Sequence, residues 1–180
     1  MRIPVVLAAC LLTAAGPVAA HVVLAQRAAP VSSYYKASFQ VGHGCEGSAT
    51  VAIRVDIPDG IAVAKPQPKS GWDVTTERGP LANPTTVHGK IVTEGVRSIT
   101  WRGGPLADDH FDEFGAMLLL PAQPGRLHFR VLQTCERGAI DWAAIPEPGS
   151  EPPRAPTPAL DVFDPADEHR DDSAHHHGHH

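Results

Sequence analysis

Histidine and cysteine are the residues of this 180-residue chain that could do metal chemistry, since it contains 11 histidines and three cysteines. Five histidines stand among the last six residues, in the run His175-His176-His177-Gly178-His179-His180. Neutral imidazoles on a flexible, acid-rich segment form a chelator for Cu(II), Zn(II) or Ni(II), and its binding should weaken as the pH falls through about 6.5. An expression tag would also end in histidines, but Gly178 interrupts this run and an acidic stretch leads into it, which favours a natural tail.

The first 20 residues have the three regions of a secretory signal peptide. Arg2 supplies the positive charge, an apolar run extends from Ile3 to Gly16, and Val18-Ala19-Ala20 places small residues at the cleavage site. We therefore expect a cleaved signal peptide, a periplasmic location and no membrane span in the mature chain. Cleavage makes His21 the first residue, whose free amine and imidazole Nδ1 can together chelate a metal such as Cu(II).

The cysteines predict a disulfide. Cys10 leaves with the signal peptide, so Cys45 and Cys135 remain as an even pair in an oxidising compartment. A bond between them would close a loop of 90 residues, for which the chain-entropy model gives about 4–5 kcal/mol. A blue-copper thiolate site at His43-Gly44-Cys45 is the alternative, but Glu136-Arg137-Gly138 after Cys135 lacks the second ligand that such a loop usually carries.

The middle of the chain consists of short strand patterns bounded by turn residues. In one of them Val51, Ile53, Val55 and Ile57 alternate with polar residues before the turn Pro58-Asp59-Gly60. The predicted strands are Tyr34–Val41, Ala49–Ile57, Ile61–Lys65, Trp72–Glu77, Lys90–Thr93, Ser98–Arg102, Glu113–Leu120 and Arg126–Thr134. Short strands in this number, each bounded by turn residues, predict an all-β antiparallel sandwich, immunoglobulin-like or cupredoxin-like.

Composition excludes other classes and sets the domain limits. With 16 Gly and 18 Pro the chain is no helical bundle, and a net charge of −5 with scattered arginines argues against nucleic-acid binding. Proline is dense from Pro146 to Pro158, which predicts an extended, hydrated chain. We therefore place the domain at residues 21–146 and a flexible tail at 147–180, in which the apolar island Leu160–Phe163 could dock onto the domain.

Six segments of the predicted domain, in order, are similar to one known family. They are His21-Val22-Val23-Leu24, Tyr34-Tyr35-Lys36, Gly42-His43-Gly44-Cys45-Glu46-Gly47-Ser48, Pro68-Lys69-Ser70-Gly71-Trp72, Ile99-Thr100-Trp101-Arg102-Gly103-Gly104 and Gln133-Thr134-Cys135-Glu136-Arg137-Gly138. This pattern resembles the YcnI-like copper-binding domain, in its Cys-containing proteobacterial branch, over residues 21–146. The resemblance implies a secreted or membrane-attached β-sandwich of bacterial copper homeostasis.

The resemblance also implies a metal site, a monohistidine brace for Cu(II). Its ligands would be the amine and imidazole of His21 and the carboxylate of Glu46, with a tryptophan beside the metal. Trp142 is the best match for that tryptophan and Trp101 is the alternative. His43, three residues before Glu46, could approach the same site, but the favoured interpretation is a solvent-exposed loop histidine.

The leading functional hypothesis is a non-enzymatic periplasmic protein that captures Cu(II) or hands it to a copper transporter or a periplasmic copper chaperone. No catalytic residue is predicted, since the chain shows no hydrolase or phosphate-binding motif. One alternative is a copper-dependent oxidase or mono-oxygenase, which would need a second histidine, and no later histidine has a metal-like local context. The other is an immunoglobulin-like interaction module without a metal.

Overall fold

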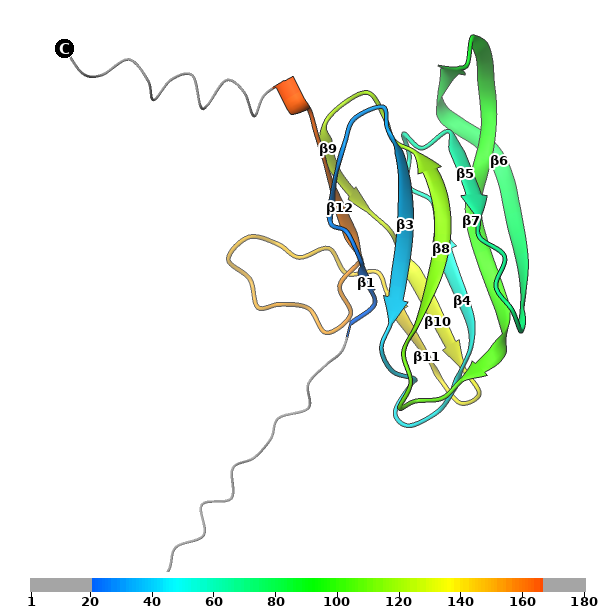
Figure 1. Cartoon of the computed structure of the whole chain (residues 1–180). Coiled ribbons are helices and arrows are strands. Elements are labelled where there is room, and N and C mark those ends of the chain that lie inside the picture. Colours follow the sequence, from blue (N-terminus) through cyan, green and yellow to red (C-terminus); the bar gives the residue numbers. More distant parts are fainter. Residues whose placement is uncertain (1–20, 167–180) are drawn as a thin grey trace, which may run out of the picture.

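Two β-sheets pack face to face in the computed structural model, which describes residues 21–166 (Figure 1). The predicted signal peptide and the terminal histidines lie outside the described residues. The four-stranded sheet has the order β1 (Val23–Leu24), β3 (Tyr34–Val41), β8 (Asp112–Leu119) and β5 (Val63–Pro66). The five-stranded sheet has the order β11 (Ala139–Trp142), β10 (Val131–Cys135), β4 (Thr50–Asp56), β7 (Lys90–Leu106) and β6 (Trp72–Val87).

The alternating patterns predicted the central strands of both sheets. The segment Tyr34–Val41 forms β3 with the predicted bounds and pairs along its whole length with β8. Strand β4 fills most of the predicted Ala49–Ile57 and lies between β10 and β7. The prediction of an all-β sandwich is therefore confirmed.

The strands β6 and β7 form a hairpin longer than the sequence indicated. Lys90–Thr93 and Ser98–Arg102 belong to one continuous strand, β7, because irregular register in the pairing with β6 lets the ladder continue past Gly95. The turn residues His88 and Gly89 have φ angles of 49° and 76°, the left-handed backbone that a tight hairpin turn requires.

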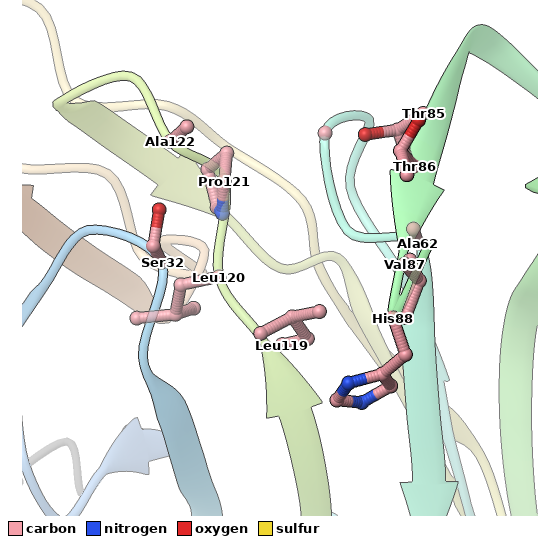
Figure 2. A pocket seen from close by; sticks show the side chains of 11 residues that line it. Ser32, Ala62, Thr85, Thr86, Val87, His88, Leu119, Leu120, Pro121 and Ala122 are labelled. Atoms are coloured by element: carbon pink, nitrogen blue, oxygen red, sulfur yellow. The ribbon is translucent and has the colours of Figure 1, made fainter. Parts of the chain in front are cut away.

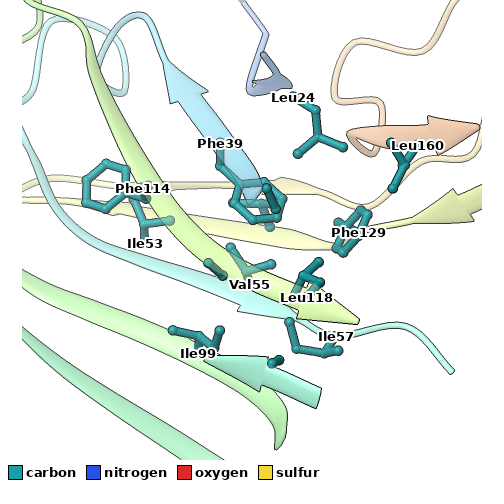
Figure 3. Close-up of a cluster of buried hydrophobic side chains, with 14 of the residues drawn as sticks. Leu24, Phe39, Ile53, Val55, Ile57, Ile99, Phe114, Leu118, Phe129 and Leu160 are labelled. Carbon is teal, nitrogen blue, oxygen red and sulfur yellow. The ribbon is translucent and has the colours of Figure 1, made fainter. Parts of the chain in front are cut away.

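The core is an aromatic and aliphatic layer between the sheets (Figure 3). Phe39, Phe114, Phe129 and Trp101 are completely buried, and the rings of Phe39 and Phe129 meet edge to face at 5.4 Å. Phe129 lies where the chain leaves β9 (Gly125–His128) and enters β10, so the single strand predicted over Arg126–Thr134 is in fact two strands of different sheets.

The predicted tail boundary at residue 147 is wrong. After the proline-rich stretch the chain returns as β12 (Ala159–Phe163), which lies between β2 (Ala28–Pro30) and β9 in a third sheet. Leu160 and Val162 are 0% and 4% exposed, and Leu160 joins the core shown in Figure 3. The proline-rich stretch forms an isolated bridge between Ala144 and Pro156, and the alternating apolar residues that follow it bury one face. The pairing of β12 with β2 in this third sheet is parallel, whereas every pairing within the two sheets of the sandwich is antiparallel, as predicted.

The predicted disulfide is confirmed. Cys45, in the loop after β3, is bonded to Cys135 at the end of β10, with an S–S distance of 2.07 Å. It connects a loop of the four-stranded sheet to the five-stranded sheet. In residues 21–166 no helix has the length and apolar character needed to cross a membrane.

Candidate metal centre around Trp142

Trp142 contacts two histidines at the edge of the five-stranded sheet. It ends strand β11 and is 3% exposed. The His21 ring lies edge-on to the indole with the ring centroids 5.8 Å apart, and the His43 ring lies at 6.2 Å in a similar geometry. The structure thus brings together His21 and the tryptophan that we predicted to lie beside the metal.

Gln133 holds this tryptophan in place. Its side chain is completely buried, and its amide oxygen accepts a hydrogen bond from Trp142 Nε1 at 3.0 Å. Its amide nitrogen donates to the carbonyl oxygen of His43 at 2.7 Å and to Thr50 Oγ1 at 2.8 Å. One side chain therefore fixes the indole and the His43 loop together, and every polar atom in this small network has a partner.

Glu46 lies at the tip of a tight turn closed by two backbone hydrogen bonds between Cys45 and Ser48. Glu46 and Gly47 have φ angles of 51° and 79°. A left-handed backbone costs a non-glycine residue roughly 1–2 kcal/mol, so the turn and the adjoining disulfide impose this conformation on Glu46. The Glu46 side chain is exposed, and its position is set by a well-anchored backbone.

The His43–Cys45 segment is anchored on its other side by Gly44. The Gly44 amide donates to Asp108 Oδ1 at 2.9 Å, and a Cβ at this position would lie 1.9 Å from the carbonyl oxygen of Ser48. Only glycine fits there. Our interpretation of His43 as a solvent-exposed loop residue is wrong, since this segment presses its half-buried ring against Trp142.

Trp101, the alternative tryptophan, belongs to the core. It is 0% exposed, its Nε1 donates to the carbonyl oxygen of Gln67 at 3.0 Å, and its ring packs on Phe114 at 5.7 Å. Within the described residues, no group of three or more His, Cys, Asp and Glu side chains is arranged to hold a metal. The candidate metal ligands near Trp142 are therefore the two histidine rings, together with the amine that signal cleavage would expose.

The remaining described histidines have structural partners. His128 Nδ1 lies 2.9 Å from Thr157 Oγ1, and burial, assisted by the charge of Arg126, lowers the pKa of His128. His88 Nε2 lies 3.0 Å from the hydroxyl of Tyr34. His110 is exposed beside Asp109.

Comparison with known proteins places the chain in a family. Residues 21–162 match the model of a domain of unknown function, DUF1775. The chain belongs to the DUF1775 family. It is also similar to a solved structure titled "Crystal structure of an uncharacterized protein from Nocardia farcinica reveals an immunoglobulin-like fold", with 22% sequence identity and a TM-score of 0.61 over 79% of this chain and 97% of that chain. No curated protein matches the chain.

The DUF1775 domain therefore has an immunoglobulin-like fold, as the strand pattern predicted. The family match ends inside β12, which supports the corrected domain boundary. Sequence reasoning missed Gln133. Its signal was the alternation of Val131, Gln133 and Cys135, which puts a polar residue on the inward face of a strand.

Several hollows open on the surface of the described domain. One of about 280 Å³ lies between the His88 turn and the loop at Pro121 (Figure 2), and another of about 240 Å³ adjoins it. Both are distant in the fold from Trp142. A third, about 210 Å³, is bordered by His21, Arg27, Arg126 and Ala159. His21 therefore borders this hollow, and its ring contacts Trp142.

Proposed function

We propose that this protein binds Cu(II) at its mature N-terminus in the periplasm and captures the ion or hands it to a copper transporter or chaperone. The observation that carries the proposal is the contact between His21 and Trp142, a tryptophan whose orientation Gln133 fixes. The resemblance to the YcnI-like copper-binding domain supports the same pair of residues. The function of the DUF1775 family is unknown, so copper binding is our proposal and does not follow from the family match.

The donor set suits Cu(II) as a cargo. The amine and Nδ1 of His21 form a chelate of two nitrogens, and nitrogen with carboxylate donors binds Cu(II) more tightly than other divalent ions of the series. The amine is neutral far more readily than a lysine, because its reference pKa is about 7.7–8.0. Glu46 supplies the carboxylate in this proposal, from a turn that the disulfide anchors.

Trp142 serves the site by excluding water from one side of the ion. Its buried ring forms an apolar wall beside His21, while the hollow next to His21 leaves another side open. An ion bound at such an open site can pass to a partner protein by exchange of ligands. The terminal histidines would then act as a separate and weaker reservoir, whose imidazoles release copper as they protonate below about pH 6.5.

Selective acetylation of the α-amine tests the proposal. The protein is the full mature chain beginning at His21, with His169, His175, His176, His177, His179 and His180 replaced by glutamine to remove the competing tail. Electron paramagnetic resonance at one equivalent of Cu(II) should show nitrogen coupling, and acetylation should remove the contribution of the amine nitrogen and weaken binding by at least about tenfold, or 1.4 kcal/mol. The unmodified chain is the control.

Glu46→Gln is the second arm of this experiment, since it removes the carboxylate charge and keeps the shape of the side chain. We expect a changed Cu(II) spectrum and weaker binding in this variant. Identical spectra and affinities for the acetylated and unmodified chains would show that copper binds elsewhere and would overturn the proposed function.

A further inference from the structure

We propose that His43 is a second imidazole ligand of the N-terminal copper site, so that three nitrogens hold the ion. This inference rests on the proposed function and changes its ligand set. It also reverses the interpretation of His43 that the sequence suggested, since the structure puts this side chain beside Trp142.

The first argument is geometric. The rings of His21 and His43 both contact the indole of Trp142, at 5.8 and 6.2 Å between ring centroids and at steep interplanar angles of 83° and 67°. Trp142 itself is held by its hydrogen bond to Gln133, so both imidazoles contact one ring whose position is fixed. In the processed protein nothing precedes His21, so its backbone and side chain can turn toward an ion that His43 also contacts.

The second argument concerns the proton on the His43 ring. Nδ1 of His43 is hydrogen-bonded to the carbonyl oxygen of Gly44, and a carbonyl can only accept. In this contact the ring proton of neutral His43 is on Nδ1, so a metal would bind through Nε2. Metal-binding histidines commonly donate their other N–H to a backbone carbonyl in this way, which fixes both the tautomer and the direction of the ring.

The third argument is that the His43 backbone is rigid. Its carbonyl accepts from the buried Gln133 amide, the next residue donates to Asp108, and Cys45 is held in the disulfide. A flexible chain terminus gains most from a partner ligand that is already in place, since little further ordering is needed when the ion binds. His43 meets this requirement through its backbone, whereas Glu46 extends from the exposed tip of the turn.

Pulsed electron paramagnetic resonance can count the imidazoles. The probe is one equivalent of Cu(II) added to the full mature chain with the six tail histidines replaced by glutamine. We expect the modulation pattern of two coordinated imidazoles in this protein and of one in its His43→Gln variant. Copper affinity should fall by about tenfold or more, at least the loss caused by removing an outer partner of a metal ligand.

His110→Gln is the matched control, because His110 is exposed and lies in a loop beside Asp109. It should leave both the spectrum and the affinity unchanged. A one-imidazole pattern in the protein that retains His43, with normal loss of binding on acetylation, would overturn the role of His43 and leave the proposed function standing. If the spectrum showed no nitrogen coupling that depends on the α-amine, that result would instead overturn the proposed function. The imidazole count in the protein that retains His43 decides the question even if the variant folds poorly.

Discussion

At the scale of single residues, Gln133 organises the candidate site. A glutamine that is completely buried is uncommon, and this one satisfies both its oxygen and its nitrogen inside the protein. Its partners are the indole of Trp142, the backbone of His43 and the hydroxyl of Thr50. The amide therefore couples the stability of the fold to the positions of the side chains that we assign to copper.

Gln133→Leu should lower the free energy of unfolding by about 2–4 kcal/mol, because it leaves the Trp142 N–H buried without its acceptor and removes the hydrogen bonds to the His43 carbonyl and the Thr50 hydroxyl. Urea unfolding followed by tryptophan fluorescence measures the loss. Thr134→Ala, on the neighbouring outward-facing position, is the control and should change stability far less. Equal stabilities for Gln133→Leu and the unaltered protein would contradict this role.

Sequence reasoning predicted one of the ring contacts at Trp142 and missed the other. His21 was identifiable because the signal-peptide pattern ends just before it, and Trp142 because of the family resemblance. Gln133 and His43 were not, because their importance depends on which strand faces and loops meet in space. The polar residue between Val131 and Cys135 could be recognised as buried only once the register of β10 was known.

At the scale of elements, β12 is the central strand of the third sheet, between β2 and β9. The strand alternation predicted β3 and β4 well, since half-buried strands repeat every two residues. It could not predict where β12 docks, because the preceding prolines are typical of a linker and the strand pairs with β2, more than 100 positions earlier. The continuity of β7 was hidden for a similar reason, since irregular register is a property of the pair of strands.

Leu160→Ala should lower the free energy of unfolding by about 2–5 kcal/mol, since this side chain is fully buried in the core. Asp161→Ala is the matched control on the opposite face of β12. Its ion pair with Arg126 is solvent-exposed and should contribute less than about 1 kcal/mol. Denaturant unfolding of both variants compares them. If Leu160→Ala unfolds like the unaltered protein, β12 contributes no stability and residues beyond 147 form a tail after all.

At the scale of the whole molecule, the pH dependence of stability reports on how the third sheet is packed. Burial lowers the pKa of His128, on β9, below its ordinary value of 6.5. The positive charge of Arg126 acts in the same direction, and Asp161 on β12 opposes it. Because the folded protein resists protonation of His128, the unfolded chain takes up protons first as the pH falls.

Stability should therefore be fully present above about pH 6.5 and should decline as the pH falls from that value toward the lower pKa of folded His128. His128→Gln, which can still bond to Thr157, should remove this part of the decline. Urea unfolding at about pH 7.5 and about pH 5 for both proteins isolates the contribution, since all other titrating groups are shared. Parallel pH profiles would exclude His128 as its source.

Strand β12 runs parallel to β2, so its two ends lie near different parts of the chain. The beginning of β12 borders the same hollow as His21, whereas its end is bonded through Phe163 to Val31. From its first residue to its last, β12 thus extends about 13 Å away from this hollow. A dye, bead or sensor chip attached after this strand would leave the His21 imidazole open to solution, whereas a handle attached directly ahead of His21 would cover it.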